Sequence, residues 1–113
     1  FPFELEIKQG NEQTIELSEI EGNQLNYLKP IPPGQSVFYY LEGFGDSPKD
    51  YDIRIDHAQT GAGVRITGDK PLSDLAYWSI HTTLCPEPYI KIEVDPGKVF
   101  EWDIKYDFYV KKD

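Results

Sequence analysis

The chain has 113 residues, enough for one domain, and its 20 acidic and 11 basic residues give a formal net charge of −9 at pH 7. Such an acidic surface disfavours nucleic acid and anionic membranes as partners. The one cysteine, Cys85, excludes an internal disulfide, and no apolar run approaches the ~20 residues of a membrane span. We expect a cytoplasmic protein, with a secreted domain that lacks disulfides as the alternative.

The first part of the chain predicts strands separated by turns. Alternating apolar and polar residues predict a strand over residues 3–8 and a shorter strand over 14–20, which together would form a hairpin. Residues 23–35 contain three prolines and predict an extended connector outside the sheet ladder. Residues 36–41 are apolar on both faces, so they predict a central strand or a strand covered on both sides.

The middle of the chain predicts a second hairpin. Residues 51–56 and 64–67 alternate in character, and the glycine-bearing segment 57–63 connects them. After a turn, residues 72–75 predict a single helical turn and residues 76–80 predict the next strand.

The C-terminal part carries the clearest strand pattern, because every second residue from Phe100 to Val110 is apolar. Residues 89–94 alternate in the same way, and Asp95-Pro96-Gly97-Lys98 is typical of a turn between two paired strands. We therefore expect a closing hairpin. About eight short strands without a periodic helix predict an all-β fold, an antiparallel β-sandwich, in a single domain over residues 1–113.

Glu87 is the strongest candidate for chemistry. It lies between Pro86 and Pro88, neither of which can donate a ladder hydrogen bond, so we expect the backbone to leave the sheet here. The carboxylate would then stand on a stiff corner at a strand end. It would act as a general base or accept hydrogen bonds from sugar hydroxyls; the alternative is a solvated loop carboxylate.

Four further residues are candidates for binding a substrate. Trp78, next to Tyr77, would stack on a sugar ring, although a core position is the alternative for both. His81 lies six residues before Glu87 and would be an acid, a ligand or a structural hydrogen-bonding residue. Arg65 would contact substrate or be an ordinary surface charge. Because phosphate-binding loops, paired cysteines and H-E-x-x-H are absent from the sequence, we expect no metal and no cofactor.

The order of motifs between residues 50 and 110 resembles the C-terminal part of galactose mutarotase-like (aldose 1-epimerase) proteins. The matching elements are the strand–turn–strand unit over 53–67, Thr67-Gly68-Asp69-Lys70-Pro71-Leu72, the strand over 76–80, Glu87, Pro96-Gly97 and Tyr106-Asp107-Phe108. The resemblance implies a β-supersandwich, of which this chain would form the C-terminal half.

The resemblance also implies an activity on aldose sugars that needs no cofactor or metal. In the family's reaction a glutamate at the position of Glu87 takes the proton of the anomeric hydroxyl, and a histidine protonates the ring oxygen. The sugar ring then opens and closes as the other anomer.

Two further hypotheses stand beside the enzyme: a non-catalytic carbohydrate-binding β-sandwich and a purely structural sheet of a larger protein. A binding face would leave Trp78 or Tyr77 partly open, whereas a structural sheet would bury both. A half-domain would expose an apolar edge, so we expect a homodimer or an association with a missing N-terminal half.

Overall fold

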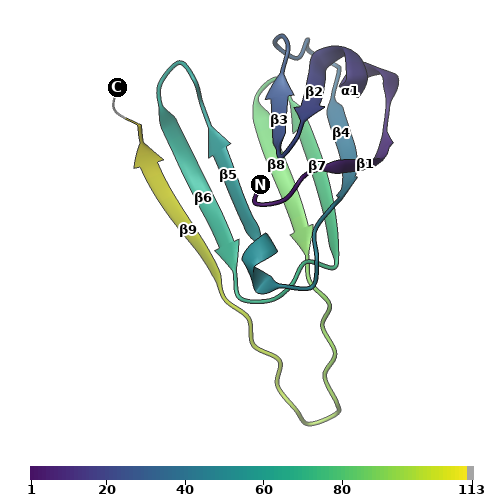
Figure 1. Ribbon diagram of the computed structural model, residues 1–113, viewed down its shortest axis with the longest axis vertical. Coiled ribbons are helices and arrows are strands. Elements are labelled where there is room, and N and C mark those ends of the chain that lie inside the picture. The colour runs from purple at the N-terminus through teal and green to yellow at the C-terminus, as the bar shows by residue number, and fades with distance from the viewer. Residues whose placement is uncertain (112–113) are drawn as a thin grey trace.

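The structure is a computed structural model that describes residues 1–111 and consists almost entirely of antiparallel strands (Figure 1). The elements in chain order are β1 (Glu6–Gly10), α1 (Glu12–Leu17), β2 (Ser18–Glu21), β3 (Gln24–Tyr27), β4 (Val37–Glu42), the 3-10 helix η1 (Pro48–Asp50), β5 (Asp52–Asp56), β6 (Ala62–Gly68), β7 (Asp74–Ile80), β8 (Thr83–Tyr89) and β9 (Ile104–Val110). They form a four-stranded sheet A (β1-β4-β7-β8), a two-stranded sheet B (β2-β3) and a three-stranded sheet C (β5-β6-β9). The predicted all-β, sandwich-like fold class is confirmed.

Sheet A provides a larger share of the core than sheet B or sheet C. β4 lies between β1 and β7, which confirms the central strand predicted over residues 36–41. Its alternate residues Val37, Tyr39 and Leu41 are fully buried, and they pair with Ser79, Tyr77 and Leu75 of β7, which are buried on the same face. Since side chains of directly paired residues point to one side of a sheet, the inner face of β4 and β7, the central strands of sheet A, is a continuous buried layer.

Sheet C contains the predicted hairpin of β5 and β6, with Asp56 paired to Gly63. β9 adds to the other side of β6 over seven consecutive pairs, from Ala62 opposite Val110 to Gly68 opposite Ile104. Ile53 of β5 and Ile66 of β6 are buried in the same core as the inner face of sheet A. Figure 1 shows β9 as the strand of sheet C farthest from sheet A, so the core ends before it reaches β9.

The strand predicted over residues 14–20 is wrong for its first part, because residues 12–17 form α1. The Asn11 side chain caps this helix by accepting a 2.8 Å hydrogen bond from the Thr14 backbone N–H. Thr14 and Leu17, three residues apart, are the buried positions, which is a helical spacing. The expected hairpin of 3–8 with 14–20 does not form, since β1 pairs with β4 instead.

Two other local predictions are also wrong. Within the segment predicted as a non-ladder connector, Gln24–Tyr27 forms β3 and pairs with β2 around Gly22, whose φ of 61° suits glycine. Residues 72–75 form no helical turn; β7 begins at Asp74. The prediction of a strand over 76–80 is confirmed.

The predicted closing hairpin is wrong, although its turn is present. Lys98 N–H donates to the Asp95 carbonyl at 3.0 Å, as a turn requires. However, β8 ends at Tyr89 in sheet A and β9 begins at Ile104 in sheet C, and residues 90–103 between them form no strand. The two ends of this long connection pair with different strands, so the local pattern could not reveal that they lie in different sheets.

Candidate functional site

The outer face of sheet A brings together two of the predicted site residues, Glu87 and Trp78. The register pairs Ala76 of β7 with Glu87 and Trp78 with Cys85 of β8. Because paired side chains share a face and alternate along a strand, Glu87 and Trp78 lie on one face of adjacent strands. Buried Tyr77 lies on the other face. Trp78 is partly exposed, as the hypothesis of a binding face requires.

Glu87 does not stand on a corner outside the sheet, because β8 runs without interruption from Thr83 to Tyr89. β8 is an edge strand, where proline is tolerated when its nitrogen points away from the sheet. Pro86 and Pro88 are two residues apart, so their nitrogens point to the same side and β8 can still bond to β7 through the residues between them. The carboxylate is therefore presented by a regular strand.

Aromatic side chains surround Glu87 and Trp78 on this outer face. Phe38 and Tyr40 of β4 pair directly with Trp78 and Ala76, and their rings meet edge to face with centroids 4.9 Å apart. Tyr40 and Tyr89 are 43% and 49% exposed. We call the set of Phe38, Tyr40, Trp78, Glu87 and Tyr89 the aromatic face.

The aromatic face is coupled electrostatically to nearby carboxylates. The Tyr89 hydroxyl donates to Glu87 Oε2 at 3.4 Å. The negative charge of Glu87 is the main cause that raises the pKa of Tyr89, and Tyr40 and Asp74 add to it. Tyr89 and Glu87 therefore place a hydrogen-bond donor and hydrogen-bond acceptors next to the aromatic rings.

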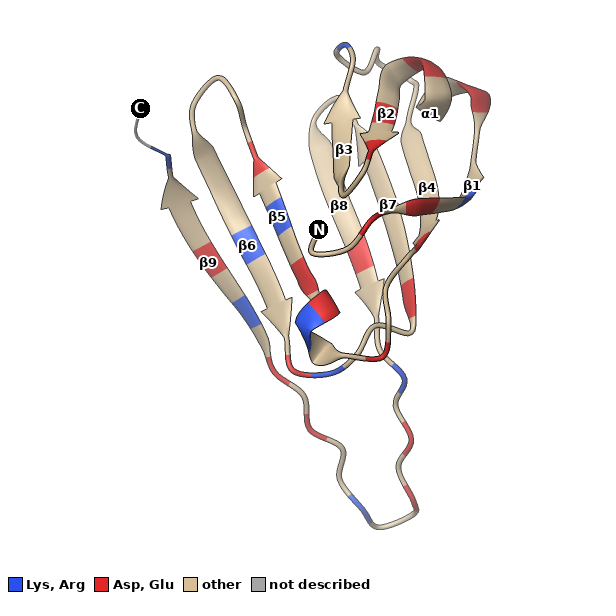
Figure 2. Ribbon diagram, viewed as in Figure 1, with Lys and Arg blue, Asp and Glu red and all other residues tan. Residues whose placement is uncertain are grey.

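A pocket of about 460 Å³ adjoins the aromatic face at Tyr40. Its polar lining includes Lys8, Glu42, Ser73 and Asp74, and the Lys8 ammonium lies 3.6 Å from a Glu42 carboxylate oxygen. Figure 2 shows acidic positions at the lower ends of β4 and β7, and the pocket lining includes Glu42 of β4 and Asp74 of β7. Tyr40 and Tyr89 were not among the residues predicted from the sequence. The alternation of Tyr40 with Tyr39 and Leu41, which are buried, is the signal that could have found Tyr40.

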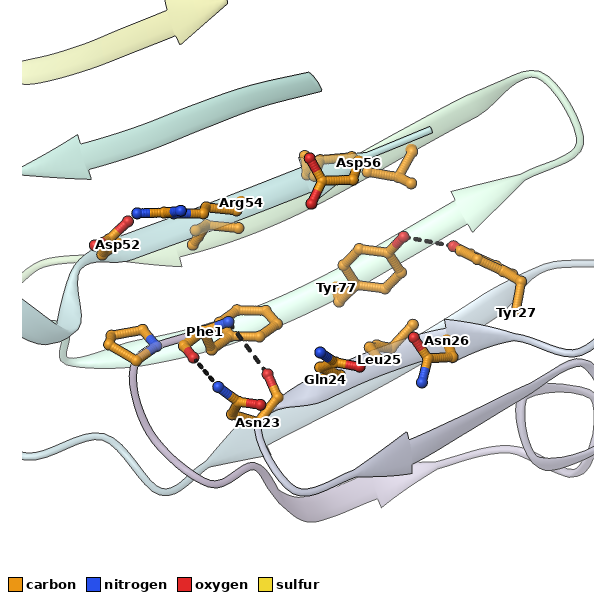
Figure 3. A pocket seen from close by; sticks show the side chains of 14 residues that line it. Phe1, Asn23, Gln24, Leu25, Asn26, Tyr27, Asp52, Arg54, Asp56 and Tyr77 are labelled. Carbon is orange, nitrogen blue, oxygen red and sulfur yellow. Dashed lines mark hydrogen bonds between the residues drawn. The ribbon is translucent and has the colours of Figure 1, made fainter. Parts of the chain in front are cut away.

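Tyr77 lies on the buried inner face, at the bottom of a second pocket of about 540 Å³ between sheet A, sheet B and β5 (Figure 3). Its hydroxyl group is hydrogen bonded to that of Tyr27, which also bonds to Ser79. Burial is the main cause that raises the pKa of Tyr77 far above its usual range. The Tyr77 side chain therefore belongs to a hydroxyl network between sheets A and B and lies on the opposite face of the sheet from Glu87.

The polar groups at the mouth of this second pocket were not predicted as site residues. Figure 3 shows Asn23 bound to Phe1: its amide donates to the Phe1 carbonyl at 2.8 Å, and the Phe1 ammonium donates to the Asn23 carbonyl at 3.1 Å. Gln24 and Asn26 also line the mouth. Their amides lie in the segment expected to be a connector, so no strand pattern pointed to them.

Arg65 lies in sheet C, away from the aromatic face. Its guanidinium group binds Asp52 with two hydrogen bonds, Nε to Oδ1 at 3.0 Å and Nη2 to Oδ2 at 2.7 Å. These hydrogen bonds are the main cause that lowers the pKa of Asp52. The pair joins β5 to β6 and occupies the guanidinium group that was predicted to contact substrate.

His81 lies in the turn between β7 and β8 and is exposed. Thr83 follows this turn, and four residue steps separate it from Glu87. Four steps along an extended strand span about 13 Å. The imidazole of His81 is thus too far from Glu87 for the two to act on neighbouring atoms of one sugar.

No protein-family model matches the chain, and no curated protein or solved structure matches it either. Within residues 1–111, no three His, Cys, Asp or Glu side chains are grouped so that they could hold a metal ion. The same part of the chain has no helix of the length and apolarity needed to cross a membrane. The assignment to mutarotase-like proteins stays a prediction.

Proposed function

We propose that the protein binds carbohydrate, without catalysis of its own, on the aromatic face of sheet A. The observation that carries this proposal is the convergence of Trp78 and Glu87 on one sheet face with the exposed rings of Tyr40 and Tyr89. Aromatic rings pack on the apolar C–H faces of pyranose rings, and the neighbouring hydroxyls and carboxylates bind sugar hydroxyl groups.

The arrangement of the strands fits an extended sugar chain better than a deep cleft. β4, β7 and β8 are neighbours, so the rows that carry Tyr40 and Glu87 are about 10 Å apart across the sheet. Ala76 of β7 lies between Tyr40 and Glu87 and is buried. The larger side chains of Tyr40 and Glu87 on either side of it therefore form the exposed surface. The acidic pocket beside Tyr40 would hold a further hydroxyl-rich group at one end of the bound sugar chain.

The epimerase activity stays a prediction, since the geometry around Glu87 favours binding. Ring opening needs a proton donor near the ring oxygen while Glu87 removes the anomeric proton. His81 is too far along the strand, and the Tyr89 hydroxyl, which does reach Glu87, is a weaker acid because the Glu87 charge raises its pKa.

The proposal is tested by titrating the protein with glucose, galactose and xylose and with their β-linked oligomers, following amide and indole signals by NMR. We expect an oligosaccharide to shift the Trp78 indole signal, and Tyr40→Ala or Tyr89→Ala to weaken binding about tenfold or more. Glu87→Gln should weaken it less, because an amide oxygen still accepts a hydrogen bond.

Trp102→Ala is the matched control, since Trp102 is also partly exposed but lies in the loop after β8. It should leave the affinity unchanged. Absence of binding to every sugar, or binding lost on Trp102→Ala but kept on Tyr40→Ala, would overturn the proposal. Exchange spectroscopy between anomers in the same samples detects any epimerase activity, which Glu87→Gln should abolish.

A further inference from the structure

The outer edge of β9 has neither of the two features that protect the edges of sheet A, a proline or a shift in register. At one edge of sheet A, β8 carries Pro86 and Pro88, which cannot donate to another strand. At the other edge, the pairing of β1 shifts between Ile7 and Gln9, an irregularity that disturbs further pairing. β9 has no proline and pairs with β6 over seven residues without a shift.

The backbone hydrogen bonds show which groups of β9 remain free at this edge. Lys111 N–H donates to the Gly61 carbonyl at 2.7 Å, and the Asp103 carbonyl accepts from Asp69 N–H at 3.2 Å. These bonds flank β9 and place its odd-numbered residues in the hydrogen-bonded pairs with β6. Because antiparallel pairs alternate, the N–H and C=O groups of the even-numbered residues point outward.

The side chains of these even-numbered residues form an apolar row that the core does not cover. The row consists of Ile104, Tyr106, Phe108 and Val110, and the last two are 81% and 67% exposed. Their pairing partners in β6 include Ile66, which is buried, so the row continues the apolar face of sheet C beyond the core. A free edge with an exposed apolar row is a ready template for another strand.

The charges on the opposite face of β9 distinguish between the possible registers in which a second copy of β9 could pair with it. Lys105 and Asp107 alternate with the apolar row, and Figure 2 shows a basic and an acidic band on this strand. An antiparallel copy centred on Tyr106 places Lys105 of each chain opposite Asp107 of the other, while Ile104 faces Phe108. Centring on Asp107 would oppose two aspartates, and centring on Phe108 would oppose Lys105 and Lys111.

We propose that β9 is a dimerisation edge that pairs with β9 of a second copy of this chain, antiparallel and centred on Tyr106. The two-fold axis gives a self-complementary interface with two Lys105–Asp107 contacts. The outward N–H and C=O groups of Ile104, Tyr106 and Phe108 bond between copies, and sheet C becomes one sheet that runs through both molecules. This inference is independent of the sugar-binding face, which lies on sheet A.

Sedimentation velocity over a range of concentrations tests the dimer. We expect wild-type protein to dimerise in a concentration-dependent way, and Lys105→Asp and Asp107→Lys each to raise the dissociation constant about tenfold or more. An equimolar mixture of these two variants should form a heterodimer, and the double charge reversal Lys105→Asp/Asp107→Lys should restore the homodimer. This rescue separates the proposed register from a general loss of folding.

Two further variants sharpen the test. Tyr106→Pro removes an outward N–H group without touching the bonds to β6, so it should abolish dimerisation while the monomer keeps its circular dichroism spectrum. Within one chain Lys105 Nζ lies 3.6 Å from Asp107 Oδ1. Lys91→Asp is the matched control, because Lys91 and Glu93 are also two residues apart and form an ion pair in the exposed loop, with Nζ 2.9 Å from Oε1. A wild-type monomer up to about 1 mM, or single charge variants that dimerise like wild type, would overturn the proposal.

Discussion

Sheet A and sheet C are both antiparallel and both have one apolar face, but they bury that face to different extents. The inner face of sheet A is covered along its two central strands, β4 and β7, and Leu75 in it is 1% exposed. In sheet C the cover ends at β6, so the apolar row of β9 is open to solvent. The alternating pattern therefore specifies a strand with two unlike faces; whether the apolar face is buried depends on a second layer that the pattern does not encode.

The largest expected effect compares core residues of the two sheets. Leu75→Ala should lower the free energy of unfolding by about 2–5 kcal/mol, because it leaves a cavity in the covered layer. Phe108→Ala, although it removes more atoms, should change the stability of the monomer by no more than about 0.5 kcal/mol. Urea unfolding of dilute protein measures both. Equal losses for the two variants would mean that the row of β9 is buried after all.

An intermediate effect concerns the hydroxyl network that joins sheet A to sheet B. Tyr77→Phe should cost about 1 kcal/mol at neutral pH, since it removes a buried hydrogen bond to Tyr27. The folded state raises the pKa of Tyr77, so above about pH 10 the unfolded chain loses this proton first and stability falls as the pH rises. Urea unfolding at alkaline pH should show a flatter decline for Tyr77→Phe than for the wild type.

The matched control for the tyrosine network is Tyr106→Phe, which removes a hydroxyl from an exposed ring of sheet C. It should leave the neutral-pH stability and the alkaline decline close to those of the wild type. If both tyrosine variants flatten the decline equally, burial of Tyr77 is not the cause.

The smallest expected effect concerns the Asp52–Arg65 pair of sheet C. Because folding lowers the pKa of Asp52, the stabilisation is present above its unfolded pKa of about 3.9 and is lost as the pH falls through the lower folded value. Asp52→Asn should lower Tm slightly near neutral pH, and its Tm should fall less steeply than that of the wild type as the pH is lowered. Thermal unfolding between about pH 7 and pH 2 measures this, with Asp46→Asn in an exposed loop as control. Parallel curves for Asp52→Asn and wild type would contradict it.

The sequence predicted the fold class and the strands whose partners are adjacent in the chain, such as β5 with β6. It did not predict that β1 pairs with β4 or β9 with β6, because strand order depends on contacts between distant segments. The helix α1 was missed since Ile15 and Leu17 fit a strand period. Asn11, a favoured capping residue three positions before Thr14, was the signal that could have found it.

The candidate site was predicted in part. Trp78 and Glu87 do share a face, but the predicted set also held Tyr77, and consecutive residues of one strand must point to opposite faces. The alternation alone therefore could have excluded either Tyr77 or Trp78. The use of Arg65 in an ion pair follows from the β5–β6 register, which places Asp52 diagonally across from it on the same face.

The pairing of β9 with β6 also has a kinetic consequence. Gly68 pairs with Ile104 only after β7, β8 and the connection over residues 90–103 have been made, whereas all four strands of sheet A precede that connection. During synthesis the chain emerges from its N-terminus, so sheet A can assemble on its own while β6 still lacks a neighbour. We expect the docking of β9 to close the largest loop in the fold and to be the late, slow event of folding.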